Sequence, residues 1–397
     1  MPPDSSTPPS LPMASWLRQI ARTPQQDSFE LLSRPGMLSL ALGLPAAELF
    51  PGEALARAAG SLSSVAALQY RAPEESLKPH VIELMSARGV KCSASQIFFT
   101  VGAQQGMSLL LRLLLDSGQE VMAEEISYTG FAGALAPHDC KLLTVPTNVE
   151  TGIDVDAVEA RLRNGARPRV LYVMADGHNP LGVSLPLEKR RRLAELSREF
   201  GFYILEDDAY GQLCFGEGSP AIRSFEERWV LYIGSFSKIL APSLRLGWVV
   251  VPEELAAELA NVKEGSDLDV ASFSQHVASA ALGTGFLGKH VAALKEEYRQ
   301  RRDAMERALA EHFPSGASWS HPEGGFFTWV ELPRHLNATQ LLRRAADEQR
   351  VAFMPGGAFS LRPGAGDNCM RLCFSYCAPA VIEDGVARLG KLLRSVM

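Results

Sequence analysis

Features typical of membrane, secreted and nucleic-acid-binding proteins are missing from this sequence. Its most apolar segment, residues 109–115, is interrupted by Arg112 and is too short to span a bilayer. The first 16 residues are rich in Pro and Ser, without the basic and apolar regions of a secretory signal. The net charge is −6, so there is no excess of positive charge for binding phosphates of nucleic acid. We therefore expect a cytoplasmic protein that binds neither a membrane nor nucleic acid.

Cysteines are few and scattered, and the sequence has no CxxC pair or histidine cluster with the spacing of a zinc site. The simplest interpretation is that the six cysteines are reduced thiols of a cytoplasmic protein. Cys373 and Cys377 lie close together in the sequence, but filling of apolar space is favoured over metal binding because no partner ligands accompany them. The sequence predicts no metal site.

The 397 residues are too many for one compact core and suggest about two domains. Up to about residue 272, short apolar runs alternate with amphipathic helical stretches. This alternation predicts an α/β fold with a mainly parallel, doubly wound sheet, whose continuously apolar strands are buried on both faces. A long helical region at residues 286–312 and shorter elements after it predict a smaller α+β domain. The segment of residues 37–51 is expected to pack near that smaller domain.

Polar residues follow several of the predicted strands, at the sheet edge where open α/β sheets bind their ligands. Gly102, Ala103 and Gln104 open a helix directly after one strand. The N-terminus of a helix attracts anions such as phosphate, although the same residues alone are typical of a plain turn into a helix. Asn179 follows another strand, in a loop with the turn-forming Pro180, and its amide could donate to a phenolate oxygen.

A pair of carboxylates, Asp207 and Asp208, ends the apolar strand of residues 202–207. Two adjacent carboxylates could bind a metal, but no second cluster of ligands is evident. A buried aspartate is costly unless it has a cationic partner, and a protonated pyridine nitrogen would be such a partner. Tyr210 could then reach the phenolic oxygen of the same ring.

A single lysine, Lys238, occurs in the segment of residues 234–248, which joins two predicted core strands. Ser235, Ser237 and Arg245 of this segment can bind a phosphate dianion, the arginine through a charge-assisted pair. A lone lysine is normally a solvated surface charge, whereas a lysine among these groups is better explained as a Schiff-base nucleophile. One ligand accounts for the phosphate, the cationic ring nitrogen, the phenolate and the aldehyde, and that ligand is pyridoxal 5'-phosphate (PLP).

The motifs that contain these residues resemble those of the fold type I PLP-dependent aminotransferases of class I/II. The sequence is most similar to the branch with aminoadipate, kynurenine and aromatic aminotransferases. The motifs are, in order, TVGAQQG, ISYTG, GHNPLG, EDDAYG, GSFSK followed by LRLGW, and MRLCFS. The resemblance implies a large PLP-binding domain at residues 51–290, with a mainly parallel seven-stranded sheet between helices. It also implies a small α+β domain at residues 291–397, completed by an N-terminal arm at residues 1–50.

The resemblance further implies a role for each site residue. Lys238 resembles the Schiff-base lysine that is also the general acid–base, and Asp207 resembles the partner of the pyridinium nitrogen. Tyr210, the third catalytic candidate, and Asn179 resemble donors to the ring oxygen, and Asn179 is also expected to contact the substrate. The residues that resemble the phosphate-binding cup are Gly102, Ala103, Gln104, Ser235, Ser237 and Arg245.

Four more residues match family positions around the cofactor and the substrate. Tyr128 resembles the aromatic residue that stacks on the ring, with ordinary core filling as the alternative. Arg371 resembles the arginine that binds the substrate α-carboxylate, with a sheet-edge arginine as the alternative. Tyr70 resembles the tyrosine that reaches the cofactor phosphate of a partner subunit, which implies a homodimer with composite active sites. Gly43 is expected to line the substrate pocket.

The sequence departs from the family pattern at three places beside the substrate. The glycine-rich YGxxxG segment is YRAPEES here, Leu181 replaces a threonine, and Ser243 replaces a glycine. The predicted function is transfer of an amino group from an L-amino acid to a 2-oxo acid. The resemblance to the family alone implies 2-oxoglutarate as the acceptor. One alternative is another PLP reaction at an amino acid: elimination, replacement, cyclisation or oxidation. The other is a non-enzymatic regulator, which the acidic charge and the short arm ahead of the fold disfavour.

Overall fold

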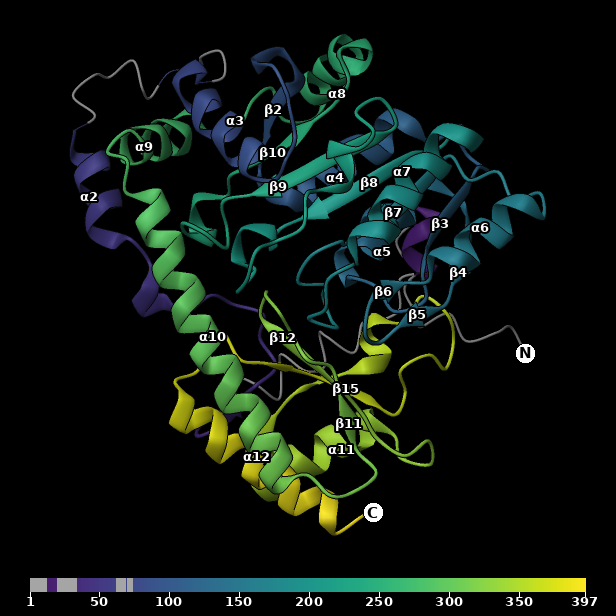
Figure 1. Cartoon of the computed structure of the whole chain (residues 1–397), viewed down its shortest axis with the longest axis vertical. Helices are drawn as coiled ribbons and strands as arrows, with labels where there is room; N and C mark the ends of the chain where they lie inside the picture. Colours follow the sequence, from purple (N-terminus) through teal and green to yellow (C-terminus); the bar gives the residue numbers. More distant parts are fainter. Residues whose placement is uncertain (1–12, 20–33, 62–68, 70–73) are drawn as a thin grey trace, which may run out of the picture.

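Two sheets and one long helix organise the molecule (Figure 1). The structure is a computed structural model, and it describes residues 13–19, 34–61, 69 and 74–397. Tyr70, predicted to reach a partner's cofactor, lies outside these residues. In the view of Figure 1 the larger sheet occupies the upper part and a smaller sheet the lower part. The helix α10 (Leu287–His312) runs along one side from the upper part to the lower part.

The larger sheet has seven strands. In spatial order they are β2 (Ile97–Thr100), β10 (Gly247–Val250), β9 (Val230–Ser235), β8 (Tyr203–Asp208), β7 (Val170–Val173), β3 (Glu120–Glu124) and β4 (Lys141–Val145). The strands from β9 to β4 pair in parallel, whereas β10 is antiparallel to both of its neighbours. The prediction of a mainly parallel seven-stranded sheet is therefore confirmed.

Both faces of this sheet are buried, as the continuously apolar strands predicted. Along β7, Val170 and Tyr172 belong to one hydrophobic cluster, while Leu171 and Val173 belong to another on the opposite face. The helices of the larger part are α2 (Gly52–Gly60), α3 (Lys78–Ala87), α4 (Gly102–Leu114), α5 (Thr129–Leu135), α6 (Val155–Arg163), α7 (Leu187–Phe200), α8 (Ala256–Asp267) and α9 (Ser272–Leu282). A short hairpin of β5 (Thr147–Asn148) and β6 (Gly152–Ile153) lies beside β3.

The smaller sheet is antiparallel. Its strands, in spatial order, are β11 (Ser318–Trp319), β12 (Phe327–Glu331), β15 (Cys369–Cys373) and β14 (Met354–Pro355). The helices α11 (Ala338–Arg344) and α12 (Pro379–Arg394) accompany it, and α12 packs against α10. Near the other end of the chain, β1 (Leu38–Ser39) pairs in parallel with β13 (Val351–Ala352). The predicted boundary between residues 290 and 291 lies inside the continuous helix α10, so the three-part division of the chain is kept as a proposal.

Within the described part of the chain, no single helix is long and apolar enough to cross a membrane. Only α9 and α10 together have the length and composition of a membrane span, and they are bent by 91° at the break between them. No cluster of three or more His, Cys, Asp or Glu side chains in the same part of the chain could hold a metal ion. All six cysteines are free thiols.

Candidate active site

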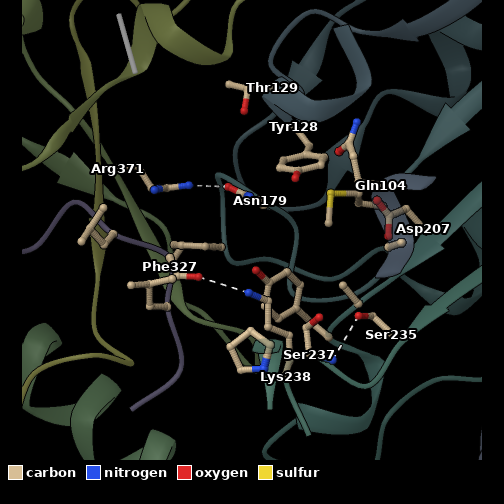
Figure 2. A pocket seen from close by; sticks show the side chains of 18 of the residues that line it. Gln104, Tyr128, Thr129, Asn179, Asp207, Ser235, Ser237, Lys238, Phe327 and Arg371 are labelled. Carbon is tan, nitrogen blue, oxygen red and sulfur yellow. Dashed lines mark hydrogen bonds between the residues drawn. The ribbon is translucent and has the colours of Figure 1, made fainter. Parts of the chain in front are cut away.

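A cavity of about 370 Å³ lies where the two sheets face each other. One wall consists of residues at or after the carboxyl ends of strands β2, β3, β7, β8 and β9, as expected for an open α/β sheet. The other wall consists of residues of β12, β14 and β15 together with the segment of residues 41–44. The predicted site residues in this lining are Gly43, Ala103, Gln104, Tyr128, Asn179, Asp207, Tyr210, Ser235, Ser237, Lys238, Arg245 and Arg371. Figure 2 shows Lys238 between Arg371 on one side and Asp207 on the other.

Donors from three elements meet at one end of the cavity. Arg245 belongs to the same segment as Lys238 and has a left-handed backbone conformation (φ 48°). Its Nη2 donates to the carbonyl of Val101 at 3.0 Å. Gly102 begins α4 with φ 73°, and a Cβ at this position would lie 2.9 Å from Arg245 Nη2. Glycine therefore lets the guanidinium lie against the N-terminus of α4. Nearby, the backbone N–H of Ser237 donates to Ser235 Oγ at 3.1 Å. A cation, hydroxyls and the amides of a helix start are together suited to a phosphate dianion.

Asp207 is a buried carboxylate with one oxygen satisfied and one not. Its Oδ2 accepts a hydrogen bond from the hydroxyl of Tyr172 at 2.8 Å, whereas Oδ1 is buried without a partner among the described residues. Burial, followed by the charge of Asp208, raises the pKa of Asp207, whereas Tyr172 and Lys238 act to lower it, and the net value is about 6. An unpaired buried acceptor costs about 1–3 kcal/mol. A cationic N–H group in the cavity would remove this cost, as the ring nitrogen of PLP can.

Two phenols line the cavity between Asp207 and Arg371. Tyr210 is buried, with its ring edge-on to Phe326 and Phe327 at centroid distances of 5.2 and 5.8 Å. Burial raises the pKa of Tyr210 well above its usual range, so its hydroxyl remains a donor. Tyr128 directly precedes α5 and is half-buried, and burial followed by the charge of Asp207 raises its pKa as well.

Lys238 lies at the centre of the cavity, held by a backbone carbonyl. Its Nζ donates to the carbonyl of Gly43 at 3.2 Å and lies 5.5 Å from the centroid of the Phe326 ring. Burial, followed by the cations Arg371 and Arg245, lowers the pKa of Lys238, and the net value is about 8. Roughly a tenth of an amine is neutral one pH unit below its pKa. Lys238 can therefore act as a nucleophile and as a base near neutral pH.

Arg371 is a buried cation whose partners are neutral. From β15, its Nη1 donates to Asn179 Oδ1 at 2.7 Å, and its Nη2 donates to the carbonyl of Ala41 at 2.6 Å. The guanidinium lies over the rings of Phe327 and Phe359, 4.2 and 4.8 Å from their centroids. In the part of the chain that the structure describes, its Nε is buried without a partner. Burial lowers its pKa to about 10, so it stays charged at neutral pH. A buried cation without an acidic partner is suited to bind a ligand carboxylate.

The apolar wall of the cavity and one buried hydrogen-bond partner were not predicted from the sequence. Phe327, Met354 and Phe359 line the cavity beside Arg371, and Tyr172 bonds to Asp207. Tyr172 could have been found, because a tyrosine in a buried strand of a parallel sheet needs a hydrogen-bond partner. The apolar residues carried no such signal.

Two departures from the family pattern lie outside the lining of the cavity. Leu181 is buried in a cluster with Trp329 and Met354, and Ser243 is exposed. The expectation that these two substitutions alter the wall beside the substrate is therefore not supported by direct contact. The third departure begins at residue 70 and lies partly outside the described residues.

Comparisons with known proteins agree with the site. The family model described as aminotransferase class I and II matches residues 38–389. A 2-aminoadipate transaminase of Thermus thermophilus is 37% identical over 380 residues, covering 94% of this chain and 94% of the relative. Aromatic-amino-acid aminotransferase 1 of Thermococcus litoralis is 33% identical over 384 residues, covering 94% of this chain and 91% of the relative.

A solved structure extends the agreement to the fold. The α-aminoadipate aminotransferase of Thermus thermophilus, complexed with N-(5'-phosphopyridoxyl)-L-leucine, matches with a TM-score of 0.88 at 35% identity and 97% coverage of each chain. The phosphate-suited end of the cavity, the unpaired Oδ1 of Asp207 and the amine of Lys238 fit PLP. The chain therefore belongs to the class I and II aminotransferases, transferases of fold type I that depend on PLP.

Proposed function

We propose that this protein transfers the amino group of an L-amino acid to a 2-oxo acid, with 2-oxoglutarate as the acceptor. The observation that carries the proposal is the convergence of three groups on one cavity. These groups are the amine of Lys238, the unpaired oxygen of Asp207 and the guanidinium of Arg371. They supply a nucleophile, a partner for a cationic ring and a carboxylate receptor.

The family resemblance and the lining of the cavity support a role for each residue that would hold PLP. We assign its phosphate to the residues around Arg245, its ring nitrogen to Asp207, its ring oxygen to Tyr210 and Asn179, and its ring face to Tyr128. When bound, PLP would supply an electron sink for the bond broken at the substrate Cα. Arg371 would bind and orient the substrate α-carboxylate. Lys238 Nζ would accept the proton released from Cα, for which a pKa of about 8 is suited.

We also propose that two copies of the chain form a homodimer in which Tyr70 of one completes the site of the other. The family resemblance supports this assignment, and so does the exposure of Arg245 at the phosphate end of the cavity. A dimer mass in sedimentation equilibrium would agree with it. A cytoplasmic location is proposed on the six free thiols, which suit a reducing compartment.

The direct test is the visible spectrum of the PLP-loaded protein during addition of single amino acids without any oxo acid. We expect one group of amino acids to convert the aldehyde form of the cofactor stoichiometrically to the amine form. Addition of 2-oxoglutarate should then restore the first spectrum. Release of ammonia, peroxide or a leaving group without formation of the amine form would instead indicate another PLP reaction.

Gly43 provides a second test, because it leaves no room for a side chain. A Cβ at this position would lie 2.7 Å from Phe327 Cζ, on the ring that Arg371 covers. We expect Gly43→Ala to displace this ring or the segment and to lower kcat/KM about tenfold, since small misplacements of binding groups are costly. PLP affinity should change little. Gly52→Ala is the control, because a Cβ at Gly52 meets nothing within 4 Å. Equal kcat/KM in both variants would contradict the assignment of Gly43 to the substrate pocket.

A further inference from the structure

We propose that Tyr172 is a positioning residue that holds Asp207 ionised and oriented toward the ring nitrogen of the cofactor. The inference rests on the proposed function, because Asp207 has this role only with PLP bound. Tyr172 lies on β7 and is paired in register with Leu205 of β8. Asp207 is two residues beyond Leu205, and alternate residues of a strand face the same side. The Tyr172 hydroxyl therefore reaches Asp207 Oδ2, at 2.8 Å, from the same face of the sheet.

The ring of Tyr172 is held in place by a second aromatic residue. Phe131 of α5 stacks on it with ring centroids 4.3 Å apart and an angle of 8° between the planes. Both side chains are almost fully buried, with exposures of 1% for Tyr172 and 0% for Phe131. Stacking and burial leave the hydroxyl little freedom to turn away from Asp207. The bond to Oδ2 in turn fixes the direction of the partnerless Oδ1.

The charges around Asp207 make this hydrogen bond important for its ionisation. Burial and Asp208 raise the pKa of Asp207, and the opposing groups are Tyr172 and Lys238. Tyr128 and Tyr210 also face Asp207, and burial keeps both phenols protonated. Burial likewise raises the pKa of Tyr172 well above its usual range, so Tyr172 remains a donor. Loss of its hydroxyl would therefore raise the pKa of Asp207 from about 6 toward neutrality.

A matched control lies on β9, the other neighbour of β8. Tyr232 of β9 donates its hydroxyl to Asp208 Oδ2 at 2.7 Å, and this pair is buried as well. Asp208, however, does not line the cavity and is paired with Arg88, whose Nε lies 2.8 Å away. Tyr232→Phe and Tyr172→Phe thus remove the same atom from equivalent pairs on neighbouring carboxylates. Only the pair of Tyr172 and Asp207 faces the site proposed for the cofactor.

The experiment measures the PLP dissociation constant of the cofactor-free full chain by fluorescence quenching. It uses three pH values, one near the Asp207 pKa of about 6 and two above it. For Tyr172→Phe we expect binding weakened about tenfold near neutral pH, the usual scale for a hydrogen bond to a charged group. The loss of PLP affinity should grow as the pH falls, because the Asp207 carboxylate of the variant becomes protonated at a higher pH than that of the natural chain. The kcat of the loaded variant should fall more than its KM changes, and Tyr232→Phe should bind PLP within about twofold of the natural chain at each pH.

The outcomes separate this inference from the proposed function. If Tyr172→Phe binds PLP with an unchanged dissociation constant at all three pH values, the positioning role is wrong, while amino transfer stands. If the natural chain itself binds no PLP, the proposed function fails first. If Tyr172→Phe does not fold, Phe131→Leu keeps the hydroxyl but removes the stacked ring. The PLP dissociation constant of that variant should rise as well, but less than in Tyr172→Phe. An unchanged dissociation constant would overturn the inference.

Discussion

Lys238→Ala is expected to lower kcat about 10⁴-fold, at the upper end of what a general acid–base contributes. The physical reason is that we assign two functions to this amine, that of the nucleophile in the cavity and that of the base at the substrate Cα. No other amine lines the cavity formed by the described residues. Lys238→Arg should be equally inactive, because a guanidinium does not lose its proton in proteins. Single-turnover kinetics on the PLP-loaded variants would measure the effect.

Stability measurements distinguish this loss from unfolding. The folded-state pKa of Lys238 is about 8, below its ordinary value of 10.5, so the unfolded chain binds this proton more tightly. Lys238 therefore opposes folding below its folded-state pKa, and the penalty disappears as the pH rises from about 8 to about 10.5. We expect Lys238→Ala to melt no lower than the natural chain at neutral pH. Lys263→Ala is the comparison, because Lys263 is buried but paired with Asp267 at 2.8 Å. That variant should lose stability and keep its kcat, and the reverse pattern would contradict the assignment of Lys238.

Arg371→Met is expected to lower kcat/KM for amino acids by about 10²-fold to 10³-fold. Truncating one partner of a buried charge pair costs roughly 2–5 kcal/mol, and about 1.4 kcal/mol corresponds to a factor of ten. Methionine preserves much of the contact with Phe327 and Phe359, so the protein should fold. Cofactor affinity should change little, because Arg371 lies on the wall of the smaller sheet, whereas the groups assigned to the cofactor phosphate and ring nitrogen lie on the larger one.

Substrate pairs make this prediction specific to the carboxylate. The measurement compares kcat/KM for an L-amino acid with that for the corresponding primary amine, which lacks the carboxylate. The natural chain should prefer the amino acid strongly, and Arg371→Met should lose most of that preference. Arg362→Met is the control, because Arg362 is exposed and paired with Glu125 at 2.6 Å, outside the cavity. If Arg371→Met still preferred the amino acid over the amine as strongly as the natural chain does, the substrate carboxylate would have to bind elsewhere.

The sequence predicted those parts of the site that depend on short stretches of chain. Asp207 ends a strand and Lys238 lies between two strands, and both facts can be read from apolar runs. That the ends of parallel strands meet at one edge is a general property of such sheets, so these residues could be placed together without knowing the strand order. The insertion of the antiparallel strand β10 between β2 and β9 had no comparable local signal.

The remaining parts depend on contacts between distant segments. Arg371 bonds to the carbonyl of Ala41, 330 positions earlier, and Lys238 bonds to the carbonyl of Gly43, 195 positions earlier. Main-chain carbonyls occur at every residue, so no residue type indicates which of them is used. Tyr172 carried only a weak signal, because an aromatic residue within an apolar strand is usually explained by packing, and its need for a hydrogen-bond partner does not say which residue that partner is. Its partner became visible only with the register between β7 and β8.

The two walls of the cavity have a consequence for how the enzyme can diverge. The residues assigned to the cofactor lie at strand ends of the larger sheet, whereas Arg371, Phe327 and Met354 belong to the smaller one. The segment of residues 41–44 meets Lys238 and Arg371 through carbonyl oxygens, which survive almost any change of side chain. Gene duplicates can therefore acquire specificity for other amino acids through side-chain substitutions in the smaller sheet and in this segment. The inherited chemistry at the strand ends would remain untouched.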